Sequence, residues 1–131
     1  MVVALSIRQP WAWAIIAGRK HIENRTWRTA VRGRIAIHSS RRRDRVWRKL
    51  LNMLVGAERE ACEQSPCGCI IGTVELVACV DESDDPAFGG DIGFVLADPQ
   101  PLAEPIPCRG RLGFWAVPPE IERQIGPAST P

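Results

Sequence analysis

The stretch that decides the fold is "LSIRQPWAWAIIAGRKHIENRTW", residues 5–27. It begins inside an apolar segment, residues 2–7, that predicts a short strand. Pro10 then suits the start of a helix and Gly18 suits its end, because proline fixes φ and glycine tolerates the turn out of a helix. The sequence therefore predicts a strand followed by a short, mostly apolar helix.

A compact set of charged residues follows Gly18. Successive side chains of a strand point to opposite faces, so an extended segment from His21 onward would place Glu23 and Arg25 on one face. Lys20 would then lie at the corner between the helix and this strand. The set is either a charged surface turn or a functional site.

Outward from this stretch, the hydrophobic pattern predicts further strands and a second helix. Runs rich in β-branched and aromatic residues predict strands over residues 32–40, 69–80, 91–98 and 111–117. Apolar residues at helical spacing predict an amphipathic helix over residues 43–55, with a basic outer face.

Two loops and a tail complete this prediction. Residues 81–91, "DESDDPAFGGD", form an acidic turn-rich loop, and residues 98–107, "DPQPLAEPIP", form a connection too rich in proline to join an interior ladder. Residues 118–131 are expected to form a partly ordered tail, which leaves one domain over residues 1–117. Short strands with two or three helices and no regular βαβ alternation predict an α+β fold, a small mixed β-barrel of about five to six strands.

Composition agrees with one soluble domain. The chain has 131 residues, of which 45% are hydrophobic, enough for one core. No segment approaches the roughly 18 apolar residues of a membrane span, and the first residues lack the pattern of a secretory signal peptide. A cytoplasmic protein without membrane contact is expected. The five cysteines lack the spacing of a zinc site, so reduced thiols, no metal and no cofactor are expected.

Charge is divided unevenly along the chain. Residues 1–50 contain 13 arginines and lysines against two acids, a net charge of +11, whereas residues 51–131 contain four against 13, a net charge of −9. The fold either separates these halves into a polyanion-binding side and an acidic side, or lets them neutralise each other.

Glu75 is unusual because it interrupts an apolar strand. A buried carboxylate needs a partner, since desolvation disfavours its charged form. Simple alternation places Glu75 on the same face as Ile71, Thr73, Val77 and Cys79, and Lys20 or Arg25 would be its counter-ion. Its role is either a structural ion pair or catalysis.

Lys20 has two possible functions beside carboxylates and apolar walls. Its ammonium group can fix a phosphate or carbonyl oxygen by charge, or it can act as a general base if burial lowers its pKa. Trp11 and Trp27 flank the segment and can wall a cavity in which a nucleobase stacks, whereas Trp13 is expected to pack in the core.

The many arginines of the first half suggest a stripe that binds phosphates. The run at residues 41–45 is commonly just a solvated helix face, but beside Arg28, Arg32 and Arg34 it favours salt-sensitive binding to nucleic acid. The residues expected to contact such a ligand are Arg8, Trp11, Arg25, Trp27, Arg28, Arg41, Arg42 and Arg43.

These residues resemble a known family. The segment from Leu5 to Trp27 is similar to the start of ASCH domains, whose G-x-K-x-x-E-x-R signature is met by Gly18, Lys20, Glu23 and Arg25. Later segments, including "RGRIAIHSS" and "CIIGTVELVACV", extend the similarity over residues 5–117. The resemblance implies a PUA-like β-barrel whose cleft, lined by the signature, takes RNA or a modified nucleoside or nucleotide.

The resemblance also implies alternatives in which the protein is a hydrolase. Some ASCH proteins deacetylate N4-acetylcytidine with the signature lysine, a threonine and a later glutamate, and others are reported to cleave RNA. Lys20 matches that lysine and Glu75 is the counterpart expected for the glutamate, but Glu23 stands where the threonine would be. The catalytic residues expected on this basis are Lys20, Glu23 and Glu75, with water replacing the threonine nucleophile.

Overall fold

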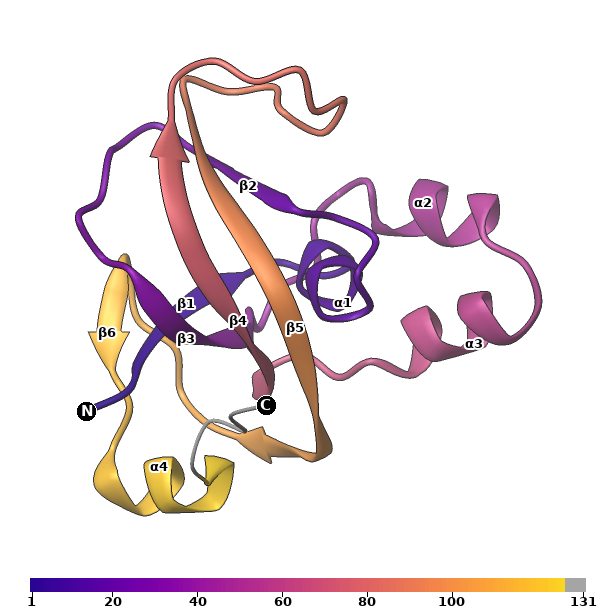
Figure 1. Cartoon of the computed structure of the whole chain (residues 1–131). Coiled ribbons are helices and arrows are strands. Elements are labelled where there is room, and N and C mark those ends of the chain that lie inside the picture. Colours follow the sequence, from indigo (N-terminus) through magenta and orange to yellow (C-terminus); the bar gives the residue numbers. More distant parts are fainter. Residues whose placement is uncertain (127–131) are drawn as a thin grey trace.

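The structure, a computed structural model, describes residues 1–126 and consists of one curled sheet with four helices (Figure 1). The six strands lie in the order β2-β5-β4-β3-β1-β6. Only β1 and β3 are parallel; the other neighbours are antiparallel. The strands are β1 (Val3–Ile7), β2 (Ile22–Arg25), β3 (Gly33–Ser39), β4 (Cys69–Val80), β5 (Ile92–Pro107) and β6 (Phe114–Ala116). The predicted mixed α+β barrel is thus confirmed, as a six-stranded half-barrel.

The main core lies between α1 (Trp11–Ile16) and the sheet. Ile15 of α1 is 1% exposed and packs in one cluster with residues of β1, β3, β4 and β5. Gly72 of β4 allows α1 to approach closely, because a Cβ there would lie 2.8 Å from Ile16 Cδ1 and 2.7 Å from the carbonyl oxygen of Gln100. The apolar helix predicted between Pro10 and Gly18 is therefore a core element.

A second, smaller core lies around Trp115 of β6. It includes Ala4, Ala36 and Ile70, and the helix α4 (Pro119–Ile125) adds Ile121 and Ile125 to its edge. Residues 119–125 of the expected tail are therefore helical. Residues 127–131 lie outside the described residues, and the boundary at residue 117 stays a prediction.

The proline-rich segment differs from its prediction. It is the second half of β5, which pairs with β4 as far as Cys69 and Pro107. Proline is tolerated there because β2 pairs with β5 only from Ile92 to Val95. Leu96 still donates its N–H to the carbonyl of His21, but beyond Leu96 the strand has β4 as its single neighbouring strand within residues 1–126. A proline nitrogen on the other edge therefore interrupts no ladder.

The helix predicted over residues 43–55 is shorter, because Asp44 ends the arginine run in a turn. Asp44 Oδ1 accepts a hydrogen bond from the Val46 N–H at 3.0 Å, and the Asp44 N–H donates to the carbonyl of Gln9 at 2.8 Å. Helix α2 (Trp47–Met53) therefore begins after the arginines. Residues 41–45 form a loop instead of a helix face.

Helix α3 (Gly56–Gln64), which the sequence analysis missed, packs against α2 beside α1 (Figure 1). Trp47, Leu51 and Cys62 form a third cluster, and Trp13 packs against it as expected. None of the helices within residues 1–126 is long and apolar enough to cross a membrane.

Candidate functional site

The described residues form an open cleft of about 1990 Å³. Its wall combines the end of β1, the segment from α1 to Trp27, the loop after β3 and the loop between β5 and β6. Eight basic residues line it against two acids, Glu23 and Asp44, a surplus of six positive charges. The basic residues are Arg8, Arg19, Lys20, Arg25, Arg41, Arg42, Arg109 and Arg111.

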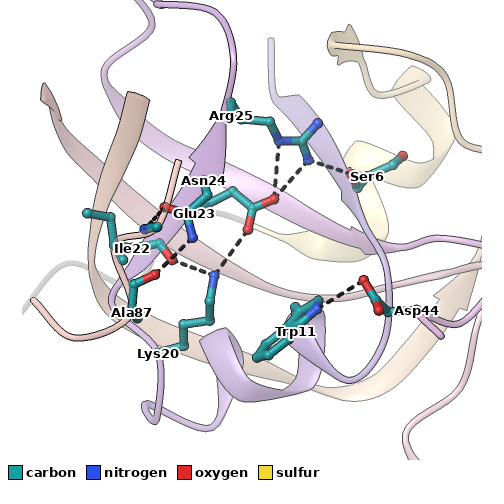
Figure 2. A network of polar contacts seen from close by, with 10 residues as sticks. Ser6, Trp11, Lys20, Ile22, Glu23, Asn24, Arg25, Asp44 and Ala87 are labelled. Carbon is teal, nitrogen blue, oxygen red and sulfur yellow. Dashed lines mark hydrogen bonds and ion pairs between the residues drawn. The ribbon is translucent and has the colours of Figure 1, made fainter. Parts of the chain in front are cut away.

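Glu23 is the centre of a polar network inside the cleft (Figure 2). Its Oε1 lies 3.3 Å from Lys20 Nζ, and its Oε2 lies 3.0 Å from Arg25 Nη2. Lys20 also donates to the carbonyl of Ile22 at 2.6 Å. The side chains of Glu23 and Lys20 are only 10% and 11% exposed, so this ion pair is largely desolvated. The prediction that Glu23 and Arg25 share one face of a strand is confirmed.

The network ties neighbouring elements to the cleft. Arg25 Nη2 donates to the carbonyl of Ser6 in β1 at 2.9 Å, and its Cζ lies 5.9 Å from the ring centre of Trp27. Lys20 Nζ lies 5.4 Å from the ring centre of Trp11, whose indole N–H donates to Asp44 at 3.3 Å (Figure 2). Both expected tryptophans therefore line the cleft, and so does Trp13, which was expected only in the core.

Trp27 is held by two aromatic rings and is still partly exposed. Its ring contacts Phe94 edge-on at a centroid distance of 5.3 Å and Phe114 at 5.7 Å, and the residue is still 36% exposed. An aromatic ring supported from behind and accessible from the cleft can stack a planar group without losing conformational freedom.

The predicted arginines separate into two groups. Arg8, Arg41 and Arg42 are exposed and line the cleft. Arg28 and Arg43 do not line it, because Arg28 pairs with Asp81 at 2.7 Å and Arg43 lies over the ring of Trp47 at 4.2 Å.

Glu75 lies outside the cleft lining, and its partner was predicted wrongly. Its Oε2 lies 3.4 Å from Nε of Arg34, not beside Lys20 or Arg25, and its side chain is 40% exposed. Nη2 of the same arginine lies 2.6 Å from Oδ2 of Asp98, and its Nη1 donates to Oγ1 of Thr73 at 3.3 Å. The structure thus places Glu75 in an ion-pair cluster across β3, β4 and β5.

The expected shared face of Glu75 is also wrong for Ile71 and Cys79. The β4 strand shifts register beside Ile71 and again beside Val77. Each β-bulge reverses the alternation of side chains. Ile71 and Cys79 consequently contribute to the main core while Glu75 does not.

Sequence analysis missed His38, which lines the cleft although it is only 2% exposed. Its Nε2 lies 2.7 Å from the carbonyl oxygen of Cys108, which can only accept, so Nε2 carries the proton. Its Nδ1 then accepts from the hydroxyl of Ser6 at 2.9 Å, and Ser6 Oγ accepts from the indole N–H of Trp115. Burial lowers the pKa of His38 below its usual 6.5, against the smaller raising effect of the Cys108 hydrogen bond.

The loop between β5 and β6, residues 108–113, was also missed as part of the site. All six residues line the cleft, including Arg109 and Arg111. The pair of arginines around a glycine was visible in the sequence, but its place beside Ser6 and His38 depends on contacts between segments far apart in the chain.

The cysteines give no sign of a metal centre. All five are free thiols, and burial raises the pKa of Cys62, Cys69 and Cys108. Among residues 1–126, no group of three or more histidine, cysteine or acidic residues is placed to hold a metal ion.

Several known proteins are similar to this chain. It is 26% identical to human activating signal cointegrator 1 and 27% identical to the mouse protein, each over 91% of this chain but only 23% of the relative. The chain thus spans under a quarter of the length of these relatives.

Solved structures show the same fold. The crystal structure of ASCH from Zymomonas mobilis superposes with a TM-score of 0.56 at 19% identity, covering 94% of this chain and 92% of that chain. A mutant of the same protein gives a TM-score of 0.58 at 18% identity, with the same coverage. The family model for the ASCH domain matches residues 5–96. The chain therefore belongs to the ASCH domain family.

Proposed function

We propose that this domain binds RNA or a nucleotide in the cleft. The observation that carries the proposal is the surplus of six positive charges among the lining residues. Nucleic acids carry a phosphate at every nucleotide, and neutralising these phosphates releases counterions, which favours binding.

Some cations of the cleft form no ion pair within residues 1–126, whereas other cations of the domain do. Three arginines of the first half pair with acids of the second half. Arg19 pairs with Glu58, Arg28 pairs with Asp81, and Arg34 pairs with both Glu75 and Asp98. Within residues 1–126, Arg8, Arg41 and Arg42 form no ion pair or side-chain hydrogen bond. The positive charge of the first half is thus neutralised at Arg19 on the cleft wall and at Arg28 and Arg34 outside it, and is left unpaired at three other residues of the cleft.

Trp27 gives the cleft a surface for a base. Its partial exposure at the cleft and its support by Phe94 and Phe114 suit stacking of a nucleobase. Glu23 in this proposal is mainly scaffold, because both of its oxygens already hold Lys20 and Arg25. It keeps the two cations in place beside Trp11 and Trp27.

Fluorescence anisotropy of a labelled single-stranded oligoribonucleotide over a series of salt concentrations tests the proposal. The variant Arg41→Ala/Arg42→Ala is expected to lower the magnitude of the log Kd against log salt slope by about 1.4, since each phosphate contact contributes about 0.7. Arg48→Ala/Lys49→Ala, which removes the same charge outside the cleft, is the matched control and should leave the slope unchanged. Absence of binding at low salt, or an equal effect of both variants, contradicts the proposal.

The hydrolase alternatives receive less support. Of the three residues expected to be catalytic, Lys20 and Glu23 line the cleft but are engaged with each other, and Lys20 Nζ also donates to Ile22. Glu75, the expected later glutamate, lies outside the cleft lining. We expect neither release of cytidine from N4-acetylcytidine nor cleavage of the oligoribonucleotide. Turnover that disappears in Lys20→Ala would overturn this expectation, and the same variant excludes a contaminating enzyme.

A further inference from the structure

The loop at residues 108–113 presents an apolar side chain to the cleft. Leu112 is 98% exposed, although it lines the cleft together with Arg109 and Arg111. A single exposed leucine normally needs no explanation. This one stands beside two exposed arginines that, within the described part of the chain, form no ion pair or side-chain hydrogen bond.

The base of this loop is held firmly. The N–H of Cys108 donates to the carbonyl of Gly68 at 3.0 Å, and the carbonyl of Cys108 accepts from His38 at 2.7 Å. Gly110 packs so closely that a Cβ there would lie 2.6 Å from His38 Cε1 and 2.7 Å from Ser6 Oγ. The tip that carries Leu112 therefore projects from a fixed support.

The other end of the loop joins the aromatic wall of the cleft. After Gly113, whose φ of 64° suits glycine, the chain enters β6 at Phe114. The ring centroid of Phe114 lies 5.7 Å from that of Trp27 and 5.9 Å from that of Phe94. The apolar tip and the proposed stacking surface are thus connected through one residue of β6.

We infer that Leu112 is a wedge that enters between two stacked bases of the bound nucleic acid, while Arg109 and Arg111 hold the phosphates on either side. This inference rests on the proposed function and deepens it, because it specifies a ligand with stacked bases. Proteins that deform nucleic acids use this combination of an apolar wedge with flanking cations. Insertion buries a side chain that is otherwise in water, which favours the complex.

The experiment uses the full chain and an oligoribonucleotide hairpin that carries 2-aminopurine, whose fluorescence rises when it is unstacked. The wild-type protein is expected to raise this fluorescence on binding. Leu112→Ala should bind about tenfold more weakly, as expected for loss of much of a buried leucine side chain, and should abolish the rise at saturation. Val55→Ala, which shortens an 81% exposed apolar residue outside the cleft lining, should behave like the wild type.

A separate variant distinguishes the wedge from the charges. Arg111→Ala should weaken binding and lower the salt slope but keep the fluorescence rise at saturation. If Leu112→Ala binds and unstacks the hairpin as the wild type does, the wedge is refuted while the proposed function stands. If the wild type binds neither the hairpin nor a single strand, the proposed function itself fails.

Discussion

The carboxylate of Glu23 holds Arg25 through one oxygen, Oε2, which lies 3.0 Å from Nη2 and 3.2 Å from Nε. The other oxygen, Oε1, is left for Lys20. One buried acid thus compensates two cations, so its removal leaves both cations without a counter-ion in a poorly solvated place.

Glu23→Gln is therefore expected to lower the free energy of unfolding by about 3 kcal/mol, the size typical of breaking a buried ion pair by removing one partner. Urea denaturation followed by circular dichroism measures this loss. Glu75→Gln is the control: its side chain is 40% exposed and Arg34 keeps Asp98, so a loss of about 0.5 kcal/mol is expected. Equal losses in the two variants would show that Glu23 is not the centre of the network.

Trp27→Ala is expected to weaken RNA binding by about 5-fold to 150-fold, because stacking of one base contributes about 1–3 kcal/mol. The slope of log Kd against log salt should stay unchanged, since no charge is removed. Trp27→Phe keeps an aromatic face and should recover most of the affinity. A changed slope, or no recovery by phenylalanine, would argue against stacking.

Gly110→Ala is expected to lower the free energy of unfolding by about 1–3 kcal/mol, the usual cost of forcing an extra methyl group into a packed site. The new Cβ would lie 2.6 Å from Cε1 of His38. Gly89→Ala, where a Cβ meets nothing within 4 Å, is the matched control and should change stability by less than about 0.5 kcal/mol. Thermal or urea unfolding of both variants makes the comparison.

His38 is expected to make stability depend on pH. Its pKa is lowered in the folded protein, so below the usual value of 6.5 the unfolded chain binds a proton that the folded chain does not. Stability is therefore complete above that pH and falls as the pH decreases toward the lowered pKa.

Urea unfolding between about pH 7.5 and pH 5.5 measures this effect. His38→Gln should be less stable at neutral pH but lose less stability on acidification than the wild type. His21→Gln removes the exposed histidine and should keep the wild-type dependence. If His38→Gln also keeps the wild-type pH dependence of stability, His38 is not the source of that dependence.

Local spacing was enough to predict part of this structure. The distances along the chain between Lys20, Glu23 and Arg25 determine how they meet, because only a corner and one short strand separate them. In the same way, β4 was predicted with its observed bounds, since a mostly apolar, β-branched run of that length has few alternatives.

Features that depend on distant segments were not predictable. Glu75 was placed on the wrong face because β-bulges next to Ile71 and Val77 leave no mark in a pattern of alternation. His38 bonds to the carbonyl of Cys108, which lies 70 residues away in the chain, so the local sequence around either residue does not predict the contact. Asp44 ended the expected helix because it bonds to Gln9 and Trp11 in another element.

The long strand β5 also bears on how the protein behaves in concentrated solution. Its second half has an open edge, and an open edge invites a strand from another molecule. Proline has no backbone N–H, so the edge lacks hydrogen-bond donors for a strand of another molecule at four positions, Pro99, Pro101, Pro105 and Pro107. The prolines that made this segment look like a connection thus protect the domain from edge-to-edge aggregation.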